Sequence, residues 1–183
     1  MKLYETYPER VELNGKVYEI DLDFRNVLRA FDLAKGDWTE REQLELSIIL
    51  LLKHPEERPA DIGEQAALLS AIFSLFPKKE SDGEKVIDLE QDAGMIRSAF
   101  FRLGIDLTND KVHFFRFMEI LSDLPQDTAL MRTVEIRQRK MPKPNAHNQE
   151  EIAALAKAKA RVAIRMSEDE QRRRFAESLR RVK

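Results

Sequence analysis

Histidines and closely spaced carboxylates are the residues of this sequence whose types could support catalysis or metal binding. The three histidines, His54, His113 and His147, lie about 59 and 34 residues apart, with no HExxH or paired-ligand spacing. His113 lies beside aromatic residues in a predicted helix, which is typical of a hydrogen-bonded histidine at the edge of a core. A metal ligand or general base is the alternative at that position.

The carboxylates of Asp88-x-Glu90-x-Asp92 resemble the start of a calcium-binding loop. Such a loop needs glycine at its sixth position and a bidentate glutamate at its twelfth, where this chain has Ala93 and Ala99. An acidic first turn of a helix explains the same carboxylates, because negative charge is favourable at a helix N-terminus. We therefore expect a helix to start near Asp88.

Other catalytic patterns are missing from the sequence. Asp21-x-Asp23 could bind a metal, but a turn followed by a helix cap is the simpler interpretation. The chain has no cysteine, no G-x-S-x-G, no Walker loop and only six glycines. We predict a protein that is not an enzyme and that needs no cofactor or metal; an enzyme with unrecognised catalytic carboxylates is the last alternative.

Charge is distributed unevenly along the chain. The net charge is −2, yet residues 1–128 hold 16 Lys and Arg against 26 Asp and Glu, and residues 129–183 hold 15 against 7. An acidic body with a basic C-terminal region can attract an acidic partner or a second copy. The longest apolar run, residues 48–52, is far too short to span a bilayer, and no signal peptide is evident, so we expect a soluble protein without a membrane partner.

The periodicity of apolar residues predicts a mainly α fold that begins with a β-hairpin. Asn14-Gly15 between alternating apolar residues favours a type I′ turn joining strands at about 9–13 and 16–20. Six short helices then follow, the second opened by Thr39 with Gln43. They are expected at 23–36, 40–53, 60–76 and 88–104, after a cap at Thr108, and after a cap at Asp127 or Thr128.

The fifth predicted helix carries an aromatic cluster around His113. Phe114, Phe117, Met118 and Leu121 recur at the spacing of one helix face and are predicted to be core. Phe115 is the aromatic residue most expected at the surface.

A proline-containing linker, residues 141–147, separates the hairpin and helical body at 1–140 from a C-terminal arm at 148–183. The arm is predicted to be one long helix from Asn148 to about Arg181, bent near Ser167. Its apolar stripe is rich in alanine and buries too little to be stable alone, so we expect it to dock or to bind a partner.

The basic residues of the arm raise a second possibility. Arg172, Arg173 and Arg174 could neutralise phosphates. Acidic residues are interleaved with them, and Phe175 is the one aromatic residue nearby, so a solvated or protein-binding helix is favoured over nucleic-acid binding.

Two blocks of residues resemble the gene-product-fifteen family of siphophages of Gram-positive bacteria. The first block is Tyr7-Pro8, Val11-Glu12-Leu13-Asn14-Gly15 and Ile20-Asp21-Leu22-Asp23-Phe24-Arg25. The second is Asp92-Ala93, Ile96, Ala99-Phe100, Gly104-Ile105-Asp106-Leu107, His113-Phe114-Phe115-x-Phe117, Leu121-Ser122-Asp123-Leu124-Pro125 and Ile136-Arg137. The chain departs from the family pattern at Phe114 and Phe115, where tryptophans are more usual.

The resemblance implies a tail assembly chaperone that binds the tape measure protein while the tail tube polymerises. It also implies a second tail assembly chaperone and the major tail protein as possible partners, action in the host cytoplasm, and absence from the mature virion. Self-association is expected as well. A structural tail or head–tail component retained in the virion is the main alternative, and a nucleic-acid-binding module is the second.

The predicted partner-binding residues are the hairpin edge, the exposed aromatic of the fifth helix, and the apolar and basic positions of the arm. They are Val17, Ile20, Phe115, Leu155, Val162, Met166, Phe175, Arg172, Arg173 and Arg174.

Overall fold

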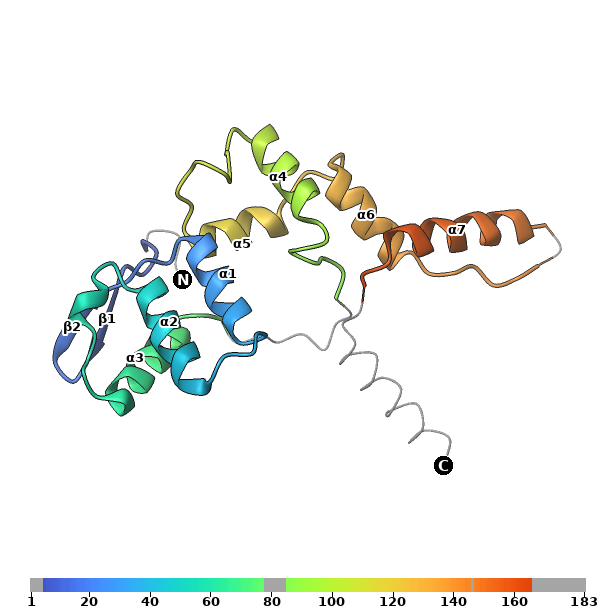
Figure 1. The fold of residues 1–183 in the computed structure, drawn as a ribbon. Helices are drawn as coiled ribbons and strands as arrows, with labels where there is room; N and C mark the ends of the chain where they lie inside the picture. Colours follow the sequence, from blue (N-terminus) through green and yellow to red (C-terminus); the bar gives the residue numbers. More distant parts are fainter. Residues whose placement is uncertain (1–4, 78–84, 146, 166–183) are drawn as a thin grey trace, which may run out of the picture. The chain divides into compact units, whose positions relative to one another are not determined.

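The computed structural model of the chain describes residues 5–77, 85–145 and 147–165. Within these residues the fold is mainly α, with seven α-helices and one antiparallel β-hairpin (Figure 1), which confirms the predicted fold class. None of the helices in these ranges is both long and apolar enough to cross a bilayer.

Backbone contacts divide the chain into two units that interleave along the sequence. The first unit contains Met1–Ser81 and Asn109–Asp123, and the second contains Asp82–Thr108 and Leu124–Lys183. The predicted boundary at residues 141–147 rests on composition and stays a prediction.

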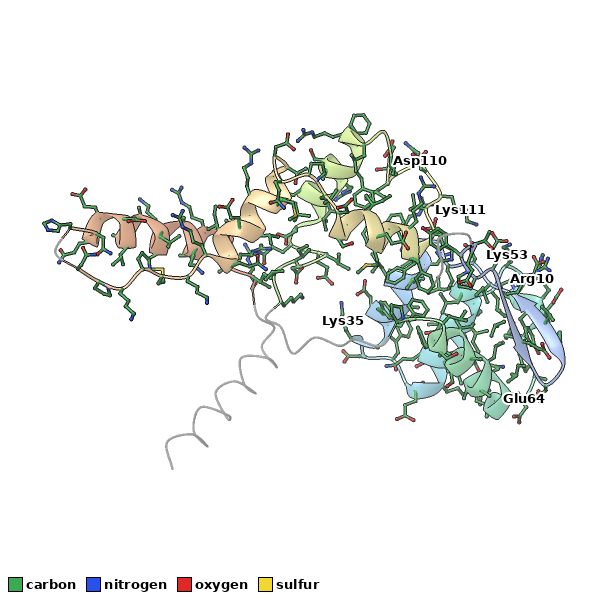
Figure 2. The ribbon with its side chains drawn as sticks, turned by 180° about the vertical axis from the view of Figure 1, so that it is seen from behind. Arg10, Lys35, Lys53, Glu64, Asp110 and Lys111 are labelled. Carbon is green, nitrogen blue, oxygen red and sulfur yellow. The ribbon has the colours of Figure 1, made fainter. Side chains whose placement is uncertain are left out.

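The first unit begins with the predicted hairpin. Strands β1 (Arg10–Leu13) and β2 (Lys16–Glu19) pair in antiparallel register, with Leu13 opposite Lys16. The two turn residues have positive φ, 51° at Asn14 and 79° at Gly15, as a type I′ turn requires. Arg10 of β1 and Lys53, which follows α2, both pair with Glu19 of β2 (Arg10 and Lys53 are labelled in Figure 2).

Four helices and a short 3-10 turn complete the first unit. They are α1 (Phe24–Leu33), α2 (Glu40–Leu51), η1 (Pro55–Glu57), α3 (Ile62–Ser74) and α5 (Phe114–Ser122). Helix α1 packs on α2 and on α5, α2 packs on α3, and α3 packs against β1.

The core of the first unit combines stacked rings with aliphatic side chains. The Phe24 ring lies parallel to the Phe117 ring, with centroids 4.7 Å apart. Phe31 contacts Phe73 and Phe114 through their rings, so α1, α3 and α5 share one aromatic layer. The fully buried aliphatic residues beneath it include Val27, Ile48, Leu51, Leu68 and Ile72.

Helix α2 begins with a capping box whose second residue differs from the prediction. Thr39 Oγ1 accepts a hydrogen bond from Glu42 N, and Glu42 Oε2 accepts one from Thr39 N at 2.9 Å. The reciprocal partner must lie three residues after the cap, so it is Glu42 rather than Gln43.

The N-cap of helix α5 lies at His113, five residues after the predicted cap at Thr108. Residues 112 and 113 are extended instead, because Phe24 N donates to Val112 O and Phe114 N donates to Leu22 O. This short pairing fixes the start of α5 at Phe114, with His113 as its N-cap. The helix buries Phe114, Phe117 and Leu121 as predicted, but Met118 is 41% exposed and is not a core residue.

The second unit consists of three helices joined by long loops. They are α4 (Ala93–Arg102), α6 (Ala129–Gln138) and α7 (Gln149–Val162), and α6 packs against both of the others. Gly104 ends α4 as predicted, with a φ of 80°, and Ile105 N donates to Phe100 O. Thr128 caps α6, as one of the two predicted residues. The core residues include Ile96, Phe100, Leu130, Val134 and Leu155.

Two predicted boundaries in the second unit were wrong. Helix α4 begins at Ala93, because Asp88 and Asp92 hold a turn: Glu90 N donates to Asp88 Oδ1, and Asp88 N donates to Asp92 Oδ2. Helix α7 ends at Val162, since Ala163 is extended (ψ 136°), so the arm is not a single helix to Arg181. The predicted bend at Ser167 lies outside the described residues.

Candidate protein-binding groove

His113 has a structural role in the first unit. Its Nδ1 accepts a hydrogen bond from Phe115 N, so Nε2 carries the proton and donates to Pro8 O at 3.3 Å. The ring also stacks on Tyr7 with centroids 4.7 Å apart. Burial lowers the pKa of His113 despite the neighbouring carboxylates, so the ring is neutral at neutral pH. It is a hydrogen-bonded cap at the core edge, as its sequence context favoured.

Asp23 is the N-cap of α1, which confirms the simpler interpretation of the Asp21-x-Asp23 pair. Its carboxylate accepts hydrogen bonds from Arg25 N, the Arg25 guanidinium and Val112 N. Burial acts to raise the pKa of Asp23, but the hydrogen bonds and charge of Arg25 outweigh burial and lower the pKa. Asp21 accepts from Asp23 N and from Lys111 Nζ. These carboxylates join α1 to the segment before α5.

The second unit contains an ion pair that is almost fully buried. Arg137 Nη1 lies 2.6 Å from Asp92 Oδ2, and Nη2 lies 2.8 Å from Oδ1, so the contact is bidentate. The side chains of Arg137 and Asp92 are 7% and 1% exposed. The same guanidinium donates to Val86 O and Val162 O. One arginine therefore ties the loop before α4, the end of α6 and the end of α7 together.

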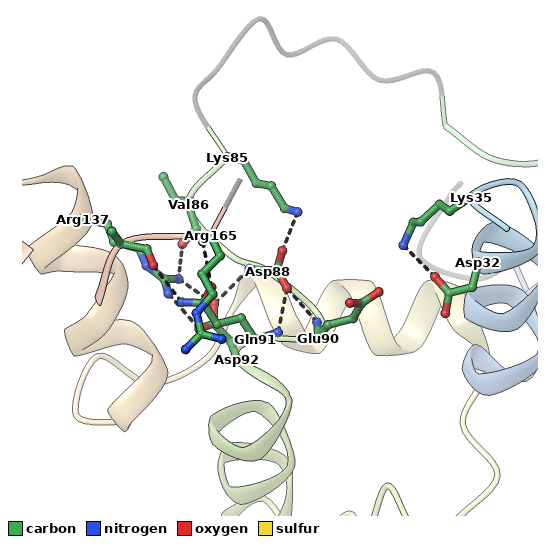
Figure 3. Close-up of polar contacts among 11 residues, drawn as sticks. Asp32, Lys35, Lys85, Val86, Asp88, Glu90, Gln91, Asp92, Arg137 and Arg165 are labelled. Atoms are coloured by element: carbon green, nitrogen blue, oxygen red, sulfur yellow. Dashed lines mark hydrogen bonds and ion pairs between the residues drawn. The ribbon is translucent and has the colours of Figure 1, made fainter. Parts of the chain in front are cut away.

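The surroundings of this pair fix the chain just after α7 (Figure 3). Lys159 Nζ donates to Arg137 O, Gln91 Nε2 donates to Ala163 O, and Arg165 N donates to Gln91 Oε1. Among the described residues, no buried side-chain nitrogen or oxygen of this network lacks a hydrogen-bond partner. Such a network orders the second unit. Among the described residues, no group of three or more His, Asp or Glu residues is arranged to hold a metal ion.

An apolar groove in the first unit is the strongest candidate for a binding site. The groove lies among α1, α2 and α3 and has a volume of about 380 Å³. Its apolar walls come from all three helices, and Glu40 is its one charged lining residue. The lining residues are Ala30, Phe31, Ala34, Glu40, Gln43, Leu44, Ser47, Leu69 and Phe73. We call this site the α1–α3 groove.

Local sequence explains why apolar surface is left open here. Phe31 is 37% exposed although it joins the aromatic layer, because α1 ends two residues later and the chain turns away. Trp38, in the turn before α2, is 47% exposed. Its backbone oxygen accepts a hydrogen bond from Gln43 Nε2, and a Cβ at Gly36 would lie only 2.8 Å from its ring. Glycine at position 36 thus leaves room for the Trp38 indole beside the groove.

The charge asymmetry of the sequence reappears between the two units. The first unit holds 13 Lys and Arg against 19 Asp and Glu, a net −6, and the second holds 18 against 14, a net +4. Near the α1–α3 groove, Lys35 is paired with Asp32 at 2.7 Å. Glu40 and Asp37 remain as exposed acids at this end of the first unit. The groove is therefore apolar with an acidic edge.

The predicted partner-binding residues fall into three groups in the structure. Val17 is 52% exposed, and Phe115 and Val162 are half-buried. Ile20 and Leu155 are core residues: Ile20 is 2% exposed in a bridge with Leu52, and Leu155 is 8% exposed on α7, which packs on α6. Neither is open to a partner in this fold. The remaining five, Met166, Arg172, Arg173, Arg174 and Phe175, lie outside the described residues.

The α1–α3 groove contains none of the predicted partner-binding residues. Helical spacing indicates that a residue faces another element, but it does not indicate whether that element covers the residue. Trp38 was the available clue, because a lone tryptophan between two helices in a polar turn is a common anchor of protein interfaces. The Asp92–Arg137 pair was also missed, although both residues lie in the recognised blocks.

The fold is mainly helical and consists of two units, with an apolar groove on the acidic one. A sequence model described as Bacteriophage Gp15 protein matches residues 3–164, and the chain belongs to this family. Neither the comparison with curated proteins nor the comparison with solved structures gives a match. The protein is therefore a bacteriophage protein, and the expected family membership is confirmed.

Proposed function

We propose that this protein is a tail assembly chaperone that binds helices of the tape measure protein during tail morphogenesis. The observation that carries the proposal is the α1–α3 groove, an open apolar surface on a member of the Bacteriophage Gp15 family. Action by binding, without catalysis, accords with the structural roles of His113, Asp23 and Asp92 described above.

The apolar lining of the groove suits an amphipathic helix. Three helices supply its walls, and its apolar surface can accept the apolar stripe of a client helix laid along it. Phe31 and Trp38 are the large exposed side chains that would anchor such a helix. Helices of a long tape measure protein that lack their final partners expose stripes of this kind, and covering them would prevent aggregation.

The proposed role also implies where the protein acts and which partners it has. The protein would act in the host cytoplasm, would leave the tail before the virion is complete, and would work beside a second tail assembly chaperone and the major tail protein. A structural tail or head–tail component is the alternative that the test must separate.

Co-expression with the tape measure protein encoded by the same phage tests the proposal. The wild-type protein should keep the tape measure soluble and should co-purify with it. Leu44→Asp places a charge in the groove and should weaken this binding by roughly tenfold or more, because burial of one leucine contributes about 1.5–3 kcal/mol.

Ile49→Asp is the matched control. It puts the same charge on the same helix at an exposed position (41%) that does not line the groove, and it should behave as the wild type. Circular dichroism must show that both variants are folded. Equal loss in both variants, or a tape measure that precipitates with the wild-type protein, would contradict the groove as the client site. Detection of this protein in purified virions would favour the structural alternative.

A further inference from the structure

The α1–α3 groove has a second candidate occupant within the sequence itself. We infer that the groove of one copy receives the C-terminal segment 172–183 of a second copy. This inference does not depend on the tape measure protein being the client, because it concerns only this chain.

The sequence of the segment fits an apolar groove. Phe175, Leu179 and Val182 recur at spacings of four and three residues, which is the sequence pattern of an apolar helix face. Phe175 is the largest of the three and would fill the space between Leu44 and Leu69, which are both half-buried wall residues.

The charges of the two surfaces are complementary. Residues 172–183 hold six Lys and Arg against one Glu, a net +5, whereas the first unit has a net −6. Glu40 is the charged residue of the groove lining, and Asp37 lies exposed before α2. A basic amphipathic segment is thus attracted to the edge of the groove, while its apolar side enters the groove.

The segment is assigned to the groove of a second copy because two copies can exchange their C-terminal segments reciprocally. Each copy carries one groove with an acidic edge and one basic segment, so a dimer with two-fold symmetry fills both grooves and docks both segments. A client helix that enters the same groove would displace the segment. The dimer would then be the resting form, and the client would convert it to the working form.

Trp38 is the single tryptophan of the chain and lies in the turn before α2, close in sequence to the groove residues Glu40 and Gln43. Its ring is 47% exposed, and its backbone oxygen is bonded to the groove residue Gln43. Docking of Phe175 beside this ring should shift its emission to shorter wavelength. Full-length protein should therefore show a blue shift as its concentration rises, in parallel with an increase in sedimentation coefficient.

Two changes in the full-length chain test the contact from its two sides. Phe175→Ala with Leu179→Ala should weaken self-association by at least about tenfold, because two apolar side chains lose their burial. Glu40→Lys should weaken it by about two- to fivefold for each charge pair lost, and added salt should reduce that difference.

Glu64→Lys is the matched control for Glu40→Lys. Glu64 (labelled in Figure 2) is also an exposed acid in the first turn of a helix of the first unit, but it does not line the groove. Both changes replace a glutamate in the first turn of a helix by lysine, so both alter the charge at a helix N-terminus in the same sense. Only Glu40→Lys should lower self-association.

A synthetic peptide of residues 166–183 completes the test. Added to the Phe175→Ala, Leu179→Ala protein, it should restore the Trp38 blue shift, whereas a peptide of scrambled order should not. Equal sedimentation of all variants would overturn the inference. A protein that stays monomeric while the double substitution still changes Trp38 emission would also overturn it, in favour of docking within one chain. If the protein self-associates as expected but does not keep the tape measure protein soluble, the proposed function is contradicted and the inference about the C-terminal segment is not.

Discussion

The two units of this protein hold their helices together by different means. In the first unit, rings from α1, α3 and α5 form one aromatic layer over a buried aliphatic core. In the second unit, a buried arginine of α6 bonds a carboxylate and a backbone carbonyl of the loop before α4 and a backbone carbonyl at the end of α7. Apolar burial tolerates an open groove at its edge, whereas a hydrogen-bonded ion pair fixes each of its partners in place.

This difference has a functional meaning in the proposed account. The first unit can leave Phe31 and Trp38 partly exposed because its other apolar residues suffice to hold the fold. The second unit has a smaller apolar core, and Arg137 fixes the position of the chain at the end of α7 by a hydrogen bond. In this proposal the binding surface lies in the first unit, and the second unit is an ordered scaffold.

Phe117→Ala should give the largest effect and should act on the first unit. Phe117 is 2% exposed and stacked on Phe24, so truncation removes a ring and leaves a cavity, at a cost of about 3–5 kcal/mol. Urea unfolding measures the loss, and hydrogen exchange should show α1 and α5 opening while α6 and α7 stay protected. Equal loss of protection in both units would show that they do not unfold separately.

Arg137→Met should give a comparable or slightly smaller effect, confined to the second unit. It leaves Asp92 buried without its partner, which costs about 3 kcal/mol. Arg102→Met is the control, because the Arg102–Asp127 pair has exposed side chains (53% and 69%) and should change stability little. If the two substitutions proved equal, the buried pair would not be the organising contact of this unit.

Thr39→Ala should cost about 1 kcal/mol through loss of the α2 cap. Because α2 forms one wall of the α1–α3 groove, the fraying should increase hydrogen exchange at the start of α2. Glu42→Gln keeps the capping box and should leave that exchange near the wild-type rate. Identical exchange at the start of α2 in the two variants would show that the capping box does not hold this wall of the groove in place.

The smallest expected effect concerns pH and His113. The folded protein lowers the pKa of this histidine, so the unfolded chain takes up its proton first, and stability should fall as pH drops below the ordinary histidine value of about 6.5. His113→Asn keeps a capping side chain for α5 and should reduce this pH dependence. Thermal unfolding at about pH 7.5 and about pH 5.5 measures it. An unchanged pH dependence would assign the effect to other groups.

Local features of this fold could be predicted from sequence, and features made by tertiary contact could not. Asn14 and Gly15 define the hairpin turn, Gly104 ends α4 and Thr128 caps α6, because each effect is decided within a few residues. The start of α5 was misplaced because the extended pairing of Val112 with Phe24 comes from a segment far away in the chain.

The binding site illustrates the same limit. Leu44 belongs to the apolar face of a helix, but the groove exists because α1, α2 and α3 meet incompletely around it. Arg137 and Asp92 lie 45 residues apart, and no local pattern joins them. Ile20 was expected at a free strand edge, yet the chain returns at Leu52 to cover it.

Hydrogen exchange of the protein alone and in its purified complex with the tape measure protein tests the central claim most directly. The account predicts slower exchange in α1, α2 and the middle of α3, around the groove residues Phe31, Leu44 and Leu69, with the second unit little changed. Protection confined to α4, α6 and α7, with the groove exchanging as in the free protein, would contradict it.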